Sequence, residues 1–159
     1  MPRYRKLPKK IHAKDQDFKQ GKLIDHYFIN LGLVSIRTIR DYDIASWTAE
    51  FYFRTGKQPA VSRTPNKGTI QLEKNESFEP RDNDLSLYSE FVKLKSGDSL
   101  KKVIKVKLFE RDLLKKDQKI IDADIEVNLA SNKSTYVIIQ DKNEYTKVKI
   151  RVYGGRTRY

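Results

Sequence analysis

The stretches VIKVKLF at residues 103–109 and KVKIRV at residues 147–152 alternate apolar and basic side chains with a period of two. Successive side chains of a β-strand point to opposite faces. Each stretch therefore predicts a strand with one face in an apolar core and the other covered by lysine or arginine. If the two strands lie in the same sheet, they form a basic face.

Several further runs are rich in β-branched and aromatic residues and are bounded by turn residues, a pattern that favours strands. Residues 23–31 and 85–94 could also be drawn as short helices. A chain of 159 residues suits one hydrophobic core. Seven or eight short antiparallel strands predict an all-β domain, a single β-sandwich or jelly roll. The predicted strands are 33–39, 47–53, 69–72, 86–94, 103–109, 119–127, 135–140 and 146–153.

The net charge of +12 is concentrated at the two ends of the chain. Residues 1–22 hold eight basic and two acidic residues, and residues 147–159 hold five basic residues and no acidic one. The central body is therefore close to neutral. We expect a basic extended arm at 1–22, a sandwich domain at 23–153 and a short basic tail at 154–159. Basic ends on a near-neutral body are typical of proteins that bind a polyanion, although charged termini can also be merely solvated.

Several classes of function are excluded or disfavoured. The chain has no cysteine, which excludes a disulfide framework, a zinc-thiolate site and a cysteine nucleophile. The common phosphate-cradling, zinc and serine-nucleophile motifs are missing, so the sequence predicts neither an enzyme nor a small-molecule substrate. It shows no apolar stretch of membrane-spanning length and no signal-peptide core, so we expect an intracellular protein, such as a component of a particle or nucleoprotein.

The first functional expectation is a non-enzymatic protein that binds the phosphates of nucleic acid, DNA or RNA, within a nucleoprotein or coat-like assembly. Tyr4, Tyr153 and Tyr159 lie next to an arginine or within two or three residues of one, and could stack on unpaired bases. The expected phosphate contacts are the basic residues of the ends, followed by those of the two alternating strands. They are Arg3, Arg5, Lys6, Lys9, Lys10, Arg156 and Arg158, then Lys105, Lys107, Lys147, Lys149 and Arg151.

A local family resemblance favours a second function. Residues 106–120 read VKLFERDLLKKDQKI and resemble the strand-and-loop segment of C2 domains, in which acid-x-acid ends a strand and another acid follows. The resemblance implies a C2-like β-sandwich that docks on anionic phospholipid membranes, with or without calcium. It also implies Glu110, Asp112 and Asp117 as metal ligands, with Asp41 and Asp43 as a loose match to a first acidic loop.

The sequence departs from the C2 pattern in ways that leave alternatives open. Gln118 stands where a second acid is frequent, and Asp122 stands where a glycine is usual. Basic residues are interleaved with the three acids, so a poor or vestigial calcium site and a salt-bridged loop are both consistent with the sequence. Lysines on a strand can also serve only to discourage aggregation at sheet edges. A third reading is a subunit of a homo-oligomer or larger complex, in which the charge serves solubility.

Overall fold

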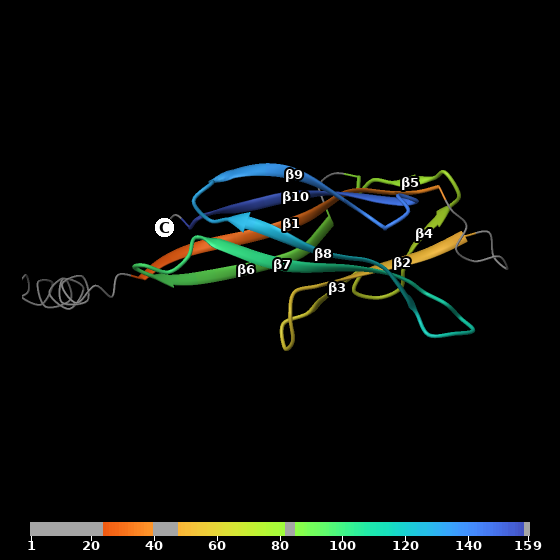
Figure 1. Cartoon of the computed structure of the whole chain (residues 1–159), viewed down its shortest axis with the longest axis horizontal. Coiled ribbons are helices and arrows are strands. Elements are labelled where there is room, and N and C mark those ends of the chain that lie inside the picture. Colours follow the sequence, from red (N-terminus) through yellow and green to blue (C-terminus); the bar gives the residue numbers. More distant parts are fainter. Residues whose placement is uncertain (1–23, 40–47, 82–84, 158–159) are drawn as a thin grey trace, which may run out of the picture.

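The computed structural model describes residues 24–39, 48–81 and 85–157. Within these ranges the chain forms ten strands and no helix (Figure 1). The strands are β1 (Ile24–Thr38), β2 (Thr48–Thr55), β3 (Ser62–Thr64), β4 (Ile70–Glu73), β5 (Ser77–Phe78), β6 (Leu85–Lys95), β7 (Lys101–Glu110), β8 (Gln118–Asn128), β9 (Lys133–Gln140) and β10 (Thr146–Arg156).

The strands form two antiparallel sheets, which we call sheet A and sheet B. In sheet A, β1 pairs with β10 on one side and with β6 and β5 on the other, and β9 completes the sheet beyond β10. In sheet B, β2 pairs with β7 on one side and with β3 and β4 on the other, and β8 lies beyond β7. The predicted all-β antiparallel sandwich is confirmed.

The core lies between the two sheets and is built by the period-two patterns of the strands. β1, β2, β7 and β10 each direct alternate apolar side chains inward, and most of these are fully buried. Burial of one such side chain stabilises the fold by about 1.5–3 kcal/mol. The fully buried positions on these four strands include Ile29, Leu31, Leu33, Phe51, Phe53, Val106, Leu108, Val148 and Ile150.

Two expectations about secondary structure are wrong. The helix alternatives for 23–31 and 85–94 fail where they are described, because residues 24–31 belong to the long strand β1 and residues 85–94 to β6. These segments pair with each other over most of their length, so their backbone groups are satisfied by the sheet. The two short strands β3 and β5 were not predicted, and β10 continues to Arg156, beyond the expected boundary at residue 153.

The condition for a single basic face, that the two basic strands share a sheet, is not met. β7 lies in sheet B and β10 lies in sheet A, so their basic side chains cover opposite outer faces of the sandwich. A period of two identifies which residues share a face of one strand, and it carries no information about which strands are neighbours.

Candidate functional site

The lysines of β7 face acidic partners on β8. Lys105 lies opposite Asp124, and Lys107 lies opposite Asp122. The Lys105 ammonium is 3.0 Å from an oxygen of Asp122 and 3.3 Å from one of Asp124. Lys119 and Lys105 hold the pKa of Asp122 below its usual value, because both stabilise its ionised form. The outer face of sheet B is therefore largely balanced in charge.

The basic residues of β10 have a different setting. The register places Lys147, Lys149 and Arg151 opposite Arg37, Ser35 and Gly32 of β1 on one side, and opposite Gln140, Ile138 and Tyr136 of β9 on the other. None of these six partners is acidic. The Lys149 ammonium lies 5.0 Å from the centre of the Tyr136 ring, and an Arg151 Nη donates to Asn30 Oδ1 at 3.2 Å.

The lack of acidic partners extends across the outer face of sheet A. Its outward strand positions also include Lys93 and Lys95 on β6. Among the strand residues described by the structure, these outward positions contain no aspartate or glutamate. Asp25 and Glu90 are not outward positions, because they lie opposite Leu94 and Ile29, whose side chains face inward. We call this surface the basic face.

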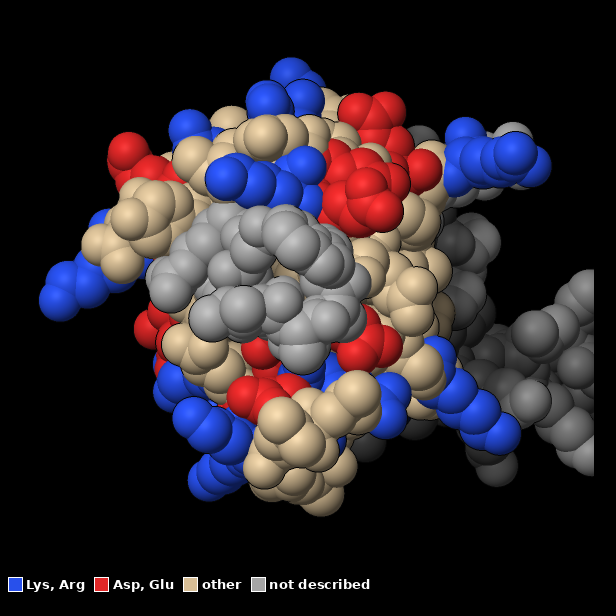
Figure 2. All heavy atoms as spheres, turned by 90° about the vertical axis from the view of Figure 1, so that its right-hand side faces the viewer, with Lys and Arg blue, Asp and Glu red and all other residues tan. Residues whose placement is uncertain are grey.

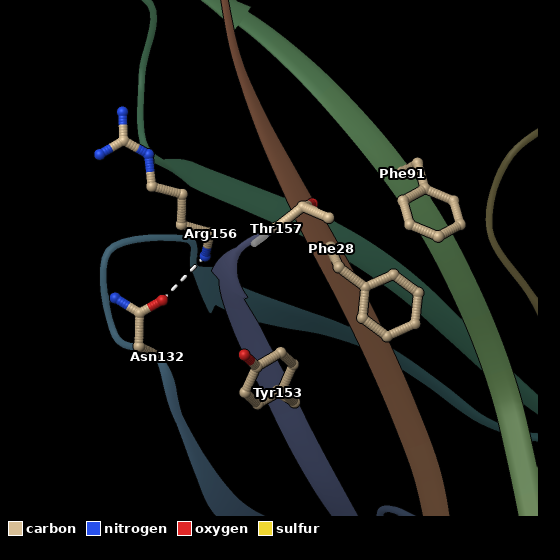
Figure 3. A pocket seen from close by; sticks show the side chains of 6 residues that line it. All are labelled: Phe28, Phe91, Asn132, Tyr153, Arg156 and Thr157. Carbon is tan, nitrogen blue, oxygen red and sulfur yellow. Dashed lines mark hydrogen bonds between the residues drawn. The ribbon is translucent and has the colours of Figure 1, made fainter. Parts of the chain in front are cut away.

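Three aromatic rings gather at one end of the basic face. Phe28 of β1 lies between Phe91 of β6 and Tyr153 of β10, with ring centres 5.0 and 6.4 Å apart (Figure 3). They line a shallow hollow of about 510 Å³. The absence of a side chain at Gly155 permits this arrangement, because a Cβ there would lie 2.4 Å from the Tyr153 hydroxyl.

Arg156, a predicted phosphate contact, is engaged within the protein. Its guanidinium forms an ion pair with Asp25, which raises the arginine's pKa, and its backbone N–H donates to Asn132 Oδ1 at 2.8 Å. Its side chain extends away from the three rings (Figure 3). The other predicted contacts of the ends, Arg3, Arg5, Lys6, Lys9, Lys10 and Arg158, lie outside the described residues, as do Tyr4 and Tyr159.

The loop between β7 and β8 presents two leucines to solvent. Leu113 is 69% exposed and Leu114 is 91% exposed. Arg111 precedes the pair, and Lys115 and Lys116 follow it directly. We call residues 111–116 the leucine tip. The acids of this stretch were predicted to bind a metal, whereas the sequence signal for the leucine tip is the adjacent leucine pair followed by two lysines.

Hydrogen bonds hold the leucine tip in place. Asp112 Oδ1 accepts from the backbone N–H groups of Leu114 and Lys115 at 2.9 and 3.1 Å. Asp117 Oδ1 accepts from the N–H of Asp112 at 3.2 Å, and its Oδ2 accepts from the Tyr52 hydroxyl at 2.6 Å. That hydroxyl lowers the pKa of Asp117 by stabilising the carboxylate.

Tyr52 connects the leucine tip to the body of sheet B. Its ring stacks on Phe109 with centres 5.3 Å apart, and the Arg63 guanidinium lies 4.3 Å from the ring centre. The two carboxylates of the loop are thus used to shape the backbone, and the leucines project from a fixed base.

The three acids implied by the C2 resemblance do not fit a calcium site. Glu110 continues the inward series of β7, lies opposite buried Phe51 and is only 3% exposed. Asp117 instead bonds to Tyr52, whose ring stacks on outward Phe109. No group of three His, Cys, Asp or Glu able to hold a metal occurs among the described residues, which exclude Asp41 and Asp43. Calcium prefers six to eight converging oxygens, and this arrangement directs Glu110 away from Asp117.

The leucine tip and part of the basic face lie toward the same end of the sandwich. β1 and β7 both run toward this end, so Arg37 near the end of β1 approaches it, as does Lys147 at the start of β10 (Figure 1). Lys and Arg side chains project outward around much of the rim of this end (Figure 2). In the described ranges there is no helix that could cross a membrane.

Comparisons with known proteins bear on the fold. No family model matches the chain, and no curated protein matches it. Human GIVD cytosolic phospholipase A2 is 12% identical with a TM-score of 0.51, over 84% of this chain and 17% of that one.

Two further solved structures carry C2 in their names. A C2 domain of plant Extended Synaptotagmin 1 is 11% identical, with a TM-score of 0.46 over 85% of this chain and 95% of that one. A C2 domain protein from Ramazzottius varieornatus is 13% identical, with a TM-score of 0.43 over 84% and 90%. Likeness at such low identity concerns the fold and carries over no activity. The two antiparallel sheets of this chain form a β-sandwich, and the chain is similar in fold to these solved structures.

Proposed function

We propose that this protein is a non-enzymatic C2-like module that docks on anionic phospholipid membranes through the leucine tip and nearby basic side chains. The observation that carries the proposal is the pair Leu113 and Leu114, 69% and 91% exposed on a loop with fixed hydrogen bonds. Lys115 and Lys116 follow the pair directly, and Arg111 precedes it with Asp112 between them. Single exposed apolar residues are ordinary, whereas an adjacent pair on a projecting loop suggests a surface that receives it.

The energies of the two parts of the leucine tip suit a lipid surface. Full burial of a leucine contributes about 1.5–3 kcal/mol, and partial insertion contributes a fraction of that. A lysine or arginine close to an anionic membrane contributes about 1 kcal/mol. Arg111, Lys115 and Lys116 would lie among the headgroups while the leucines enter the apolar layer below them.

The proposal does not require calcium. Asp112 and Asp117 accept hydrogen bonds from the loop and from Tyr52, and the charge that attracts the lipid comes from arginine and lysine. In this respect the leucine tip differs from the metal site that the sequence resemblance implied.

Nucleic-acid binding, the first expectation from the sequence, has less support. Most of its residues lie at the chain ends outside the described ranges, Arg156 is paired with Asp25, and Lys105 is paired with Asp122 and Asp124. Base edges and phosphates also offer no apolar layer for two leucines. For the third interpretation, a subunit of a larger complex, nothing about the leucine tip favours a protein partner over lipid.

The test is vesicle co-sedimentation with the full chain in the presence of a calcium chelator, with phosphatidylcholine vesicles that either contain or lack phosphatidylserine. We expect binding only to the anionic vesicles. Leu113→Ala/Leu114→Ala removes about three carbons from each leucine, and each carbon buried in an apolar layer contributes about 0.8 kcal/mol. If half of the removed carbons are inserted in the membrane, the free energy of binding weakens by about 2.4 kcal/mol, or about 50-fold in affinity.

The matched control is Val103→Ala, which trims a side chain 55% exposed on the outer face of β7, away from the leucine tip. It should bind as the unmodified chain does. Undiminished vesicle binding by the double variant would refute the proposal. Retention of DNA or RNA at physiological salt, with no vesicle binding, would refute it in favour of the nucleic-acid prediction.

A further inference from the structure

β9 is an edge strand with an unusual composition. Among the described strands it pairs only with β10, and it forms the outer edge of sheet A (Figure 1). Residues 134–140 read STYVIIQ, without a charge, a proline or a glycine. Its register with β10 has no irregularity. Such a strand presents a regular row of backbone groups that can pair with another strand.

The other two long edge strands, β8 and β6, differ from β9. β8, the edge of sheet B beyond β7, carries Lys119, Asp122, Asp124 and Glu126. β6, on the other side of sheet A, carries Glu90, Lys93 and Lys95. Charged side chains along an edge oppose pairing with a second chain. The absence of this protection is therefore specific to β9 among the three long edge strands.

We propose that β9 pairs antiparallel with β9 of a second copy of this chain, about a two-fold axis that is perpendicular to the sheet and passes midway between the two Val137 residues. In this register Val137 lies opposite the partner's Val137, and Tyr136 lies opposite the partner's Ile138. Thr135 then lies opposite the partner's Ile139. Because opposite residues of an antiparallel pair share a face, the two copies keep their outer faces on the same side.

The side chains of β9 complement themselves in this register. Tyr136 and Ile138 are 58% and 65% exposed on the outer face of sheet A. The pairing places each aromatic ring against a β-branched side chain of the partner, a favourable cross-strand combination, and covers part of each side chain.

The charges at the two ends of the strand fit the same register. Lys133, the first residue of β9, lies opposite the partner's Asp141, the residue that follows β9. Asp141 Oδ1 accepts from the N–H of Thr146 at 2.8 Å, and a carboxylate can accept several hydrogen bonds. The symmetry forms this opposite-charge pair twice, which argues for a second copy of this chain as the occupant.

The basic face does not prevent this association. The two β10 strands would be separated by three strand spacings, about 14 Å. That distance exceeds the Debye length of about 8 Å at physiological ionic strength, so repulsion between the two rows is largely screened. A single pair of eight-residue strands buries less than the roughly 1,200 Å² of a standard interface, so we expect a weak dimer with micromolar affinity.

The test uses the full chain without lipid, so its outcome is independent of membrane binding. Sedimentation equilibrium should show a reversible monomer–dimer exchange. Ile138→Lys places a charge at an exposed position on the edge and should leave a monomer with an unchanged circular dichroism spectrum. Val103→Lys adds the same charge to an exposed β-branched site of sheet B and should still dimerise.

Cysteine cross-linking tests the register, because the natural chain contains no cysteine. Directly opposite residues have Cα atoms about 4.5–5.5 Å apart, within the range of a disulfide. Val137→Cys should therefore oxidise to a covalent dimer by itself. Thr135→Cys should cross-link rapidly only when it is mixed with Ile139→Cys. A chain that stays monomeric at high micromolar concentration, or equal cross-linking at every position of β9, would overturn the proposal.

Discussion

Neutralising two pairs of lysines on opposite faces should have unequal effects on membrane binding. Lys147→Gln/Lys149→Gln removes two charges from the basic face, whereas Lys105→Gln/Lys107→Gln removes two from β7. Both variants lower the net charge of +12 by the same amount. The comparison therefore separates the position of a charge from its contribution to the total.

The expected magnitudes follow from the neighbours of each lysine. The cross-strand partners of Lys147 and Lys149 are neutral or basic, so their charge is available to an anionic surface. At about 1 kcal/mol for each residue near the membrane, their loss should weaken binding by about 2 kcal/mol, or about 30-fold. Lys105 is held by Asp122 and Asp124, and Lys107 lies opposite Asp122. Both lysines lie on the outer face of sheet B, so the β7 variant should lose less than about threefold.

The assay is titration of the protein with vesicles that contain phosphatidylserine, at low and at physiological salt. Thermal unfolding of both variants serves as the control for folding. The 30-fold effect should shrink as salt rises, because screening weakens the contribution of the charges and leaves that of the leucines. Equal losses for the two variants would show that only total charge matters, and no loss for the β10 variant would show that the basic face is not in contact. Either result refutes the reasoning.

Two further predictions concern stability and can be read by chemical denaturation. Gly154→Ala should lower the free energy of unfolding by about 1–3 kcal/mol. A Cβ at residue 154 would lie 2.7 Å from Val127 Cγ1 and 2.8 Å from the carbonyl oxygen of Asn128 on β8. Unchanged stability would mean that β8 and β10 can separate at this point. Tyr52→Phe keeps the ring that stacks on Phe109 and removes the hydrogen bond to Asp117, at a cost of about 1 kcal/mol after solvent screening. That hydroxyl lowers the pKa of folded Asp117 below its ordinary 3.8. The stabilisation that the hydrogen bond gives the folded protein is therefore complete above the pKa of unfolded Asp117, and it is lost as pH falls through the lower pKa of folded Asp117. The difference between the two proteins should therefore be largest at neutral pH and shrink in strong acid, and a difference that does not change with pH would contradict this account.

The fold could be predicted from the sequence because strand faces are encoded locally. The alternation in residues 103–109 and 147–152 correctly separated inward from outward side chains on β7 and β10. Residues 24–31 could not be assigned with the same certainty, because their apolar residues are compatible with either period over so short a run. Pairing with β6 over Ile24–Leu33 decides in favour of a strand, and that pairing partner is about 60 residues away in the sequence.

The candidate site was only partly predictable, for the same reason. Lys105 and Lys149 look equivalent in the sequence, since each lies between two apolar residues of an alternating strand. They differ in what lies across from them, Asp124 for one and Ile138 with Ser35 for the other. Glu110 is a similar case: the C2 resemblance grouped it with Asp117, whereas its position in the β7 alternation directs it inward, opposite Phe51.

The contribution of sheet A to membrane binding therefore depends on strand order more than on the number of basic residues. β10 lies between β1 and β9, and neither strand contributes an acid to the outer face. β7 lies beside β8, whose outward positions hold Asp122, Asp124 and Glu126, and these acids pair with Lys105, Lys119 and Lys101. If β9 and β8 exchanged places, β10 would be the neutralised strand and β7 would keep its charge. A variant that places acids at outward positions of β9 should accordingly cancel the contribution of Lys147 and Lys149 to membrane binding without any change to a basic residue, while Arg111, Lys115 and Lys116 of the leucine tip keep theirs.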